Sequence, residues 1–195
     1  MKDEPSDALL VIAACQGDHA AFGAIMRRHK GWLYRFIYRH VAGRDDAYDL
    51  LQESFISAWS ALARFDPDRP FEAWLRRIAL NKCRDHARRN AVRRAALAVL
   101  GLRKTQSGED ESAPTPESKA ASDRALCKLE TAIAALPRKF KEALVLTMLE
   151  GFSHKDAGEF LGISAKAVET RVYRAKRRLA AVLKRSDLSE LIGEG

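Results

Sequence analysis

The segment Phe152–Leu183 constrains the fold more than any other part of this chain, because it predicts two helices joined by a very short turn. Ser153, with Asp156 three residues later, is typical of a helix N-terminus. Gly162 predicts the end of that helix, since glycine readily adopts the left-handed conformation found there. Ser164 predicts the start of the second helix. Apolar residues of the second helix recur on one face, at Val168, Val172, Ala175 and Leu179.

The other side of this second helix is polar and strongly basic. Residues 166–185 include eight basic side chains and a single acidic one, Glu169. A helical hairpin with a solvated basic face is the simpler interpretation. The short turn, the two capping serines and the separation of the faces together favour a helix-turn-helix, whose second helix enters a DNA major groove. The residues expected at this interface are Lys166, Glu169, Thr170, Arg171, Tyr173, Arg174, Arg177 and Arg178.

Composition favours a polyanionic partner, since the 195 residues carry a net charge of +8. The chain shows no alternating pattern typical of strands, so we expect an all-α fold. It has neither an apolar run long enough to span a membrane nor a signal-peptide pattern at its N-terminus. Its three cysteines are an odd number in unrelated helical contexts. This predicts reduced thiols and a cytoplasmic location.

Metal and cofactor sites are not expected. Cys15 with His19, and Cys83 with His86, have helical spacings that a metal could use. Neither pair is accompanied by a second pair, and zinc sites usually need four ligands. No phosphate-binding glycine loop, carboxylate cluster at metal spacing or nucleophile–base pair is present, which argues against an enzyme and a small-molecule substrate.

The first half of the chain reads as successive helices. Ser6 predicts the start of a helix over Asp7–Gln16, and Asp18 predicts the start of the next. An aromatic helical run follows Gly31, and we expect Gly43 to end it. Phe22, Ile25 and Met26 are expected to pack inward.

The segment Asp45–Ala63 is amphipathic. Its expected core residues are Ala47, Leu51, Phe55, Ala58, Trp59 and Leu62. Acidic residues near a helix N-terminus are stabilised by the helix dipole, which explains Asp45, Asp46 and Asp49. That argument says little about Gln52 and Glu53. Both residues lie outside the core stripe, as Asp49 does. We therefore predict a binding surface on the polar side of this helix.

A second basic segment follows the turn-rich loop Phe65–Pro70. Ten basic residues and one acid lie between Arg76 and Lys104. Aromatic residues in and just after the loop, Phe65, Phe71 and Trp74, are of the kind on which unpaired bases stack in single-stranded nucleic-acid sites. Alternatively, these rings belong to the core and the charges are only solvated.

The residues after Lys104 predict a flexible linker, because Thr105–Ser122 has prolines, net negative charge and no large apolar side chain. The linker divides the chain into an N-terminal domain, residues 1–104, and a C-terminal domain, residues 123–195. In the C-terminal domain we expect a helix beginning at Pro137. Phe140, Leu144 and Met148 are expected to point inward in that helix.

These motifs together resemble the bacterial sigma factors of the extracytoplasmic-function (ECF) group, over most of Gly17–Leu183 apart from the linker. Asp49–Phe55 with Trp59 is similar to the family's polymerase-binding helix. Phe71–Asn81, continuing through Asp85 and Arg88, is similar to its promoter-melting helix. The second DNA-binding domain of the family resembles Leu136-Pro137 and Val168–Leu179.

The resemblance implies an RNA polymerase specificity subunit. It implies contacts of Asp49, Gln52 and Glu53 with the beta-prime clamp helices of core polymerase, and a further contact with the beta flap. The minus-thirty-five promoter element would be read by the helix-turn-helix, and an anti-sigma factor, soluble or membrane-anchored, would be a further partner. Residues implied in binding and opening the minus-ten element are Phe65, Asp66, Arg69, Trp74, Arg77, Asn81, Arg84 and Arg88.

A stand-alone helix-turn-helix regulator that binds duplex DNA is the alternative function. It would leave the polar surface at Asp49, Gln52 and Glu53 without a role. It would also leave the first basic helix unexplained.

Overall fold

The computed structural model describes residues 5–41, 43–66, 69–99 and 128–192. Within these ranges the chain forms helices and no strand, which confirms the all-α fold. Contacts divide the chain into two compact units, Met1–Lys104 and Thr105–Gly195, which are described separately below. The predicted linker, Thr105–Ser122, lies outside the described residues.

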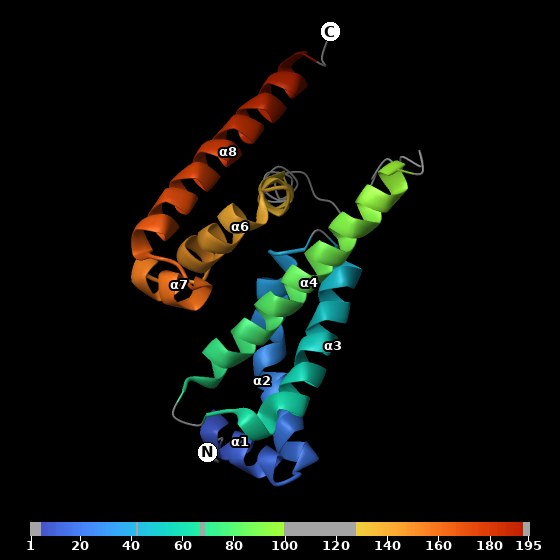
Figure 1. The fold of residues 1–195 in the computed structure, drawn as a ribbon, viewed down its shortest axis with the longest axis vertical. Coiled ribbons are helices and arrows are strands. Elements are labelled where there is room, and N and C mark those ends of the chain that lie inside the picture. Colours follow the sequence, from blue (N-terminus) through green and yellow to red (C-terminus); the bar gives the residue numbers. More distant parts are fainter. Residues whose placement is uncertain (1–4, 42, 67–68, 100–127, 193–195) are drawn as a thin grey trace, which may run out of the picture. The chain divides into compact units, whose positions relative to one another are not determined.

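Helices α2 (His19–Tyr38), α3 (Arg44–Ala61) and α4 (Phe71–Val99) pack against one another to form the N-terminal unit (Figure 1). The short α1 (Asp7–Cys15) packs on α2, and the 3-10 turn η1 (Leu62–Arg64) follows α3. The core side chains are fully or almost fully enclosed. They include Ile25, Leu33, Phe36, Ile37, Leu50 and Leu75.

Local capping signals place the first helices where the sequence predicts them. The Ser6 hydroxyl accepts a hydrogen bond from the Leu9 amide, and the Asp18 carboxylate accepts from Ala20 and Ala21. These bonds satisfy amide groups that have no partner within the helix itself.

The expected end at Gly43 is wrong. Helix α2 runs without a break through Gly31 and ends at Tyr38, whereas Gly43 is the extended residue that precedes α3. The His40 ring bonds to the Phe36 carbonyl over 2.8 Å just beyond the end of α2. The aromatic run after Gly31 therefore continues the helix that begins after Asp18, and Gly31 does not interrupt it.

Three core assignments in this unit also differ from the sequence prediction, one of them Trp59, which is half-buried on α3. Met26 is 38% exposed, and α3 buries Leu50, leaving Leu51 only half-buried. Met26 and Leu51 lie at the α2–α3 boundary, where a helical stripe meets the surface. A stripe wider than the interface cannot be buried along its whole width.

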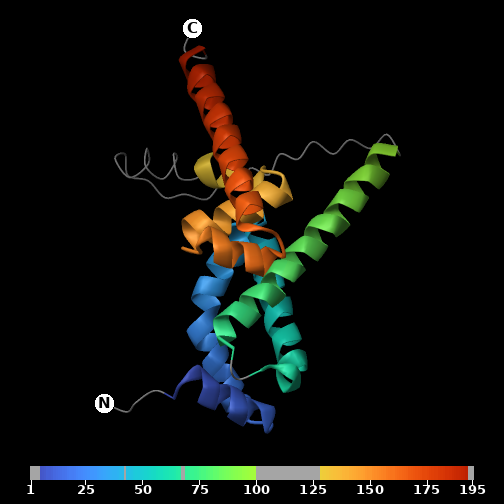
Figure 2. The ribbon, with the colours of Figure 1, turned by 60° about the vertical axis from the view of Figure 1, so that its left-hand side comes forward.

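The C-terminal part of α4 extends past the ends of α2 and α3 in both ribbon views (Figure 1, Figure 2). Side chains 91–96 are all exposed, including Val92 and two arginines, Arg93 and Arg94. None of the helices in the described ranges is long and apolar enough to cross a membrane.

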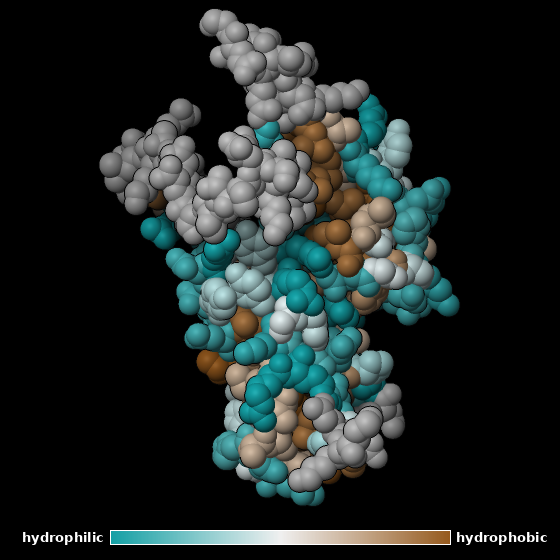
Figure 3. All heavy atoms as spheres, turned by 180° about the vertical axis from the view of Figure 1, so that it is seen from behind, coloured by the Kyte–Doolittle hydropathy of each residue, from teal (hydrophilic) through white to brown (hydrophobic). Residues whose placement is uncertain are grey.

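The C-terminal unit begins with a helical stretch at 128–134, followed by α6 (Arg138–Leu144) and a π-helical turn, η2 (Val145–Leu149). Helices α7 (His154–Leu161) and α8 (Ala165–Ile192) complete it. Figure 3 shows apolar residues of this unit at the surface beside strongly hydrophilic ones.

Met148 is one of the exposed apolar residues of this unit. Its side chain is 53% exposed, so the prediction that it points inward is wrong. Phe140 and Leu144 are buried as expected. A π-helical turn takes in an extra residue and shifts the helical phase of the residues that follow. The 3.6-residue count that places Leu144 correctly therefore fails at Met148.

Candidate functional site

The turn between α7 and α8 has the compact geometry of a helix-turn-helix. Ser153 Oγ accepts from the Asp156 amide over 3.1 Å, and Ser164 Oγ accepts from the Ala167 amide over 3.2 Å. Gly162 has a φ of 71°, the left-handed conformation expected after the first helix. The two serine caps and the left-handed glycine thus confirm the predicted helix-turn-helix.

Gly158 is a further requirement of this turn, which the sequence analysis did not find. The Ile163 amide donates to the Gly158 carbonyl, so the chain folds back directly over this residue. A Cβ added to Gly158 would lie 2.7 Å from the Ile163 carbonyl oxygen and 3.3 Å from the Ala165 nitrogen. Only a residue without a side chain permits so close an approach of backbone.

Helix α8 buries one side and exposes the other. The predicted stripe of Val168, Val172, Ala175 and Leu179 is buried, which confirms it. The predicted DNA-facing residues are exposed except for Arg171, which is half-buried: Lys166, Glu169, Thr170, Tyr173, Arg174, Arg177 and Arg178. We refer to these eight residues as the α8 outer face.

Two arginines of the α8 outer face are held by aromatic rings. The Arg178 guanidinium lies 5.2 Å from the ring centre of Phe140, and that of Arg177 lies 6.0 Å from the ring of Tyr173. Stacking of this kind restricts a long side chain before it meets a ligand. Both charges remain exposed and can meet phosphate.

Glu169 has a partner on its own helix. Lys166 Nζ donates to Glu169 Oε2 over 2.8 Å, and the Thr170 hydroxyl donates to the Lys166 carbonyl over 2.9 Å. The hydrogen bond and positive charge of Lys166 lower the pKa of Glu169, so its carboxylate stays ionised. Any hydrogen bond from DNA to this carboxylate must share it with Lys166.

Three rings in and after the loop that precedes α4 form a compact aromatic cluster, defined here as Phe65, Phe71 and Trp74. Ring centres are 5.0 Å apart for Phe65 and Trp74, and 5.5 Å apart for Phe71 with each of the others. Phe71 is buried, while Phe65 and Trp74 are half-buried. One ring thus belongs to the core and two keep surface that an unpaired base can contact.

One face of α4 carries the other residues expected at the minus-ten element. Arg77, Asn81 and Arg88 are exposed, and Arg84 is half-buried. Their spacing of three and four residues places them along one side of a helix. Arg88 also pairs with Asp85 at 3.0 Å. In the preceding loop, Asp66 and Arg69 pair with each other at 3.2 Å.

The polar side of α3 divides into two parts. Asp49 and Gln52 are exposed. Glu53 instead faces α4, where its carboxylate oxygens lie 3.8 Å from Lys82 Nζ and 3.9 Å from an Arg89 nitrogen. The interpretation that folding poorly explains Glu53 is therefore wrong, because it links two helices of the same unit.

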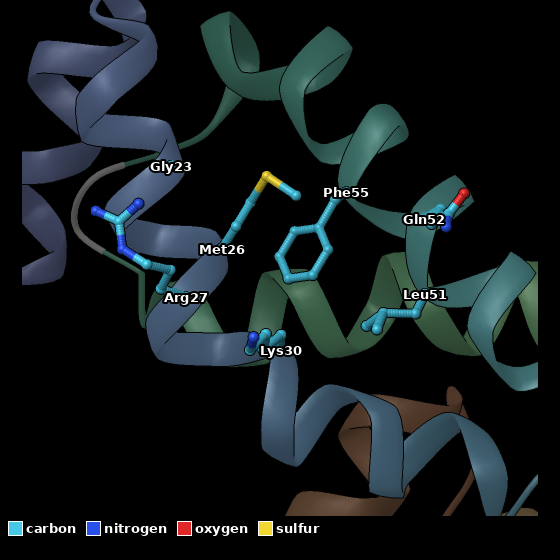
Figure 4. Close-up of a pocket in the computed structure, with 7 residues that line it drawn as sticks. All are labelled: Gly23, Met26, Arg27, Lys30, Leu51, Gln52 and Phe55. Atoms are coloured by element: carbon cyan, nitrogen blue, oxygen red, sulfur yellow. The ribbon is translucent and has the colours of Figure 1, made fainter.

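A groove of about 380 Å³ between α2 and α3 opens beside Gln52 (Figure 4). Met26 and Phe55 point toward each other across it. The residues lining this α2–α3 groove are Gly23, Met26, Arg27, Lys30, Leu51, Gln52 and Phe55. Sequence analysis missed the α2 contribution. The available signal was the pair of cations Arg27 and Lys30, which lie three residues apart beside Met26 and mark that side of the helix as a surface boundary.

No group of three or more histidine, cysteine or acidic side chains able to hold a metal occurs in the described ranges. Cys15 is exposed and Cys83 is buried.

Comparison with known proteins identifies both units. Residues 25–93 match the family model for Sigma-70 region 2, and residues 128–179 match that for Sigma-70 region 4. RNA polymerase sigma factor CnrH of Cupriavidus metallidurans is 37% identical over 185 residues, which cover 94% of this chain and 97% of CnrH. The ECF RNA polymerase sigma factor SigE of Mycolicibacterium smegmatis is 32% identical over 180 residues, covering 91% of this chain and 67% of SigE.

The solved structures that this chain resembles are also sigma factors. The structure of CnrH in complex with the cytosolic domain of CnrY superposes with a TM-score of 0.63 at 32% identity, covering 93% of this chain and 99% of that one. The sigma factor RpoE of Bartonella quintana, in complex with the anti-sigma factor NepR, superposes with a TM-score of 0.65 at 26% identity. The superposition covers 84% of this chain and 96% of RpoE. The chain therefore belongs to the extracytoplasmic-function group of RNA polymerase sigma factors.

Proposed function

We propose that this sigma factor divides its work among three surfaces: α3 holds core RNA polymerase, the aromatic cluster with α4 opens the minus-ten element, and α8 reads the minus-thirty-five element. The observation that carries this proposal is the segregation of charge. The exposed acid of α3 and the basic faces of α4 and α8 lie on different helices. We place its action in the cytoplasm, and it catalyses no reaction of its own.

For the polymerase, the proposed contact is Asp49 with Gln52 on the beta-prime clamp helices. Both side chains are exposed, whereas Glu53 is shared with Lys82 and Arg89. A second contact with the beta flap suits the apolar surface at Met148 and Leu149, which are 53% and 42% exposed. Exposed apolar side chains that adjoin each other favour protein partners.

For opening, the proposed ligand is the unpaired non-template strand. Phe65 and Trp74 offer half-buried rings to a base, and the face with Arg77, Asn81, Arg84 and Arg88 offers positive charge to the backbone. Stacking and phosphate contacts are the two parts of single-strand binding. Asp66 and Arg69, the remaining residues proposed for this element, are exposed and pair with each other.

Glu169 gives a prediction about sequence reading. A cytosine amino group donates readily to a carboxylate in the major groove. Replacing Glu169 with alanine is therefore expected to relax preference at one minus-thirty-five base pair by about tenfold. Binding to duplexes substituted at each position measures this, with Glu159→Ala on α7 as the control that removes the same charge. A uniform gain in affinity for every duplex would mean that Glu169 only repels phosphate.

Run-off transcription tests the function as a whole. Purified core polymerase with the full-length protein should start transcripts from a subset of genomic promoter fragments, and core polymerase alone should not. Absence of any added start site would contradict the proposal. A stand-alone regulator is not favoured, because region 2 and region 4 both match.

An anti-sigma factor is the proposed regulator. RpoE forms a complex with the anti-sigma factor NepR, and CnrH forms one with the cytosolic domain of CnrY. In this chain the α2–α3 groove offers an apolar floor with Arg27 and Lys30 at its rim, which suits an amphipathic helix bearing acidic residues. Gln52 lines the same groove, so a helix seated there would cover part of the polymerase surface.

Crosslinking mass spectrometry of the protein with its co-purified partner tests this regulation. Crosslinks from Lys30 to the partner, with loss of core binding in the complex, are expected. Crosslinks confined to the C-terminal unit, with core binding retained, would contradict this mode of inhibition.

A further inference from the structure

A hydrogen-bonded network joins α1 to α2 through a buried histidine. His29 is 2% exposed; its Nε2 lies 2.9 Å from Asp7 Oδ2, and its Nδ1 accepts from Trp32 Nε1 over 2.8 Å. An indole N–H can only donate, so Nδ1 carries no proton and Nε2 donates its hydrogen to Asp7. Both ring nitrogens are thus committed, and the orientation of the ring is fixed.

Asp7 is itself held in place. Its other carboxylate oxygen, Oδ1, accepts from Arg28 over 2.6 Å, and Arg28 also donates to the Pro5 carbonyl over 2.9 Å. The start of α1 is therefore tied to α2 at two adjacent residues, Arg28 and His29. Asp7 lies outside the region 2 match, which begins at residue 25.

The fixed ring of His29 lies against the aromatic cluster. Its centre is 5.3 Å from that of Phe71, the buried member of the cluster. Phe71 in turn contacts both half-buried rings, Phe65 and Trp74. The Arg76 guanidinium, one residue beyond Leu75 on α4, lies 4.8 Å from the ring of Trp32. The same histidine–tryptophan pair therefore meets α4 at two points.

We infer that Asp7 and His29 are positioning residues for promoter opening, which fix Phe71 and through it the two rings that receive an unpaired base. This inference rests on the proposed role of the cluster at the minus-ten element. A ring that is already immobilised loses less conformational freedom when a base stacks on it. The N-terminal helix α1, which contributes no proposed contact to DNA or polymerase, thereby acts on the opening step.

The experiment uses the full-length protein with core polymerase on a promoter fragment found by run-off transcription. Asp7→Ala removes the acceptor for His29, and His29→Phe keeps a ring but removes both hydrogen bonds. Each is expected to lower the permanganate reactivity of unwound thymines at least about fivefold, because the loss of a single hydrogen bond has about that effect and each variant removes two. Core affinity and closed-complex affinity should stay as in the wild type. Asp7→Asn, which keeps an oxygen acceptor, should restore most of the opening.

Asp46→Ala is the matched control. It removes the acid of another Asp–His pair in the same unit, Asp46 with His86 at 3.2 Å between α3 and α4. Normal opening by the Asp7→Ala and His29→Phe variants would overturn the inference. So would an equal loss of opening in Asp46→Ala, because that would indicate general destabilisation. Failure of the wild-type protein to open any promoter would instead contradict the proposed function.

Discussion

Replacing Gly158 with alanine is expected to destabilise the C-terminal unit by about 1–3 kcal/mol, the usual cost of forcing an extra methyl group into a closed site. Alanine normally stabilises a helix relative to glycine by up to about 1 kcal/mol. Here the new Cβ would lie 2.7 Å from the Ile163 carbonyl oxygen, and that neighbour is backbone rather than a movable side chain. The turn must therefore open, and α8 must shift relative to α7.

Gly31 supplies the matched control, because the same substitution there should have the opposite sign. Gly31 is an exposed residue of α2, and a Cβ at this position meets only the end of the Arg35 side chain, at 3.8 Å. Gly31→Ala is expected to stabilise the N-terminal unit by about 0.5–1 kcal/mol.

The two units can be followed separately in the intact protein. The three tryptophans, Trp32, Trp59 and Trp74, all belong to the N-terminal unit, so their fluorescence during urea unfolding reports on that unit. Hydrogen exchange of α7 and α8 amides reports on the other. In the Gly158→Ala variant, the amides of α7 and α8 should exchange faster, and binding to a minus-thirty-five duplex should be weaker. Stabilisation by both substitutions would show that the turn tolerates a side chain at Gly158.

The turn itself was predictable because its signals are local. Ser153, Gly162 and Ser164 act on neighbouring backbone groups, so their positions in the sequence fix the ends of two helices. Gly158 was not predictable in this way. Its requirement arises from the close approach of Ile163, and a sequence gives no distance between backbone atoms of successive elements.

Side-chain burial could be predicted only where the helical phase and the interface width are regular. The inner stripe of α8 follows a 3.6-residue period throughout and is buried as expected. Met148 follows a π-helical turn, and Met26 lies at the edge of an interface, so both are exposed against expectation. Local phase and interface edges depend on the packing of neighbouring helices.

The polar residues of α3 show the same limit at the candidate site. Asp49, Gln52 and Glu53 share one motif, and no pattern in the sequence separates Glu53 from Gln52. The structure separates them, because Lys82 and Arg89 of α4 approach Glu53. Lys82 and Arg89 follow Glu53 by 29 and 36 residues, and their position beside it depends on how α3 and α4 pack.

The double substitution Asp49→Ala and Gln52→Ala is expected to weaken binding to core polymerase at least about 30-fold, the effect of losing an interface hot spot. Both side chains are exposed, and Gln52 also lines the α2–α3 groove. Their removal leaves the core of the unit intact, so the urea midpoint should change little. Fluorescence anisotropy of labelled protein titrated with core polymerase measures the affinity.

Glu53→Ala separates a structural role from a binding role on the same helix. Because Glu53 is shared with two cations of α4, its removal should cost less core affinity than the double substitution and should lower the stability of the α3–α4 pair. Glu72→Ala, which removes an exposed acid at the start of α4, controls for the change in net charge. Unchanged core affinity in the double variant, or an equal loss in Glu72→Ala, would contradict a specific docking surface on α3. A loss in Glu53→Ala as large as in the double variant would instead place Glu53 in direct contact with polymerase, with its ion pairs to Lys82 and Arg89 broken on binding.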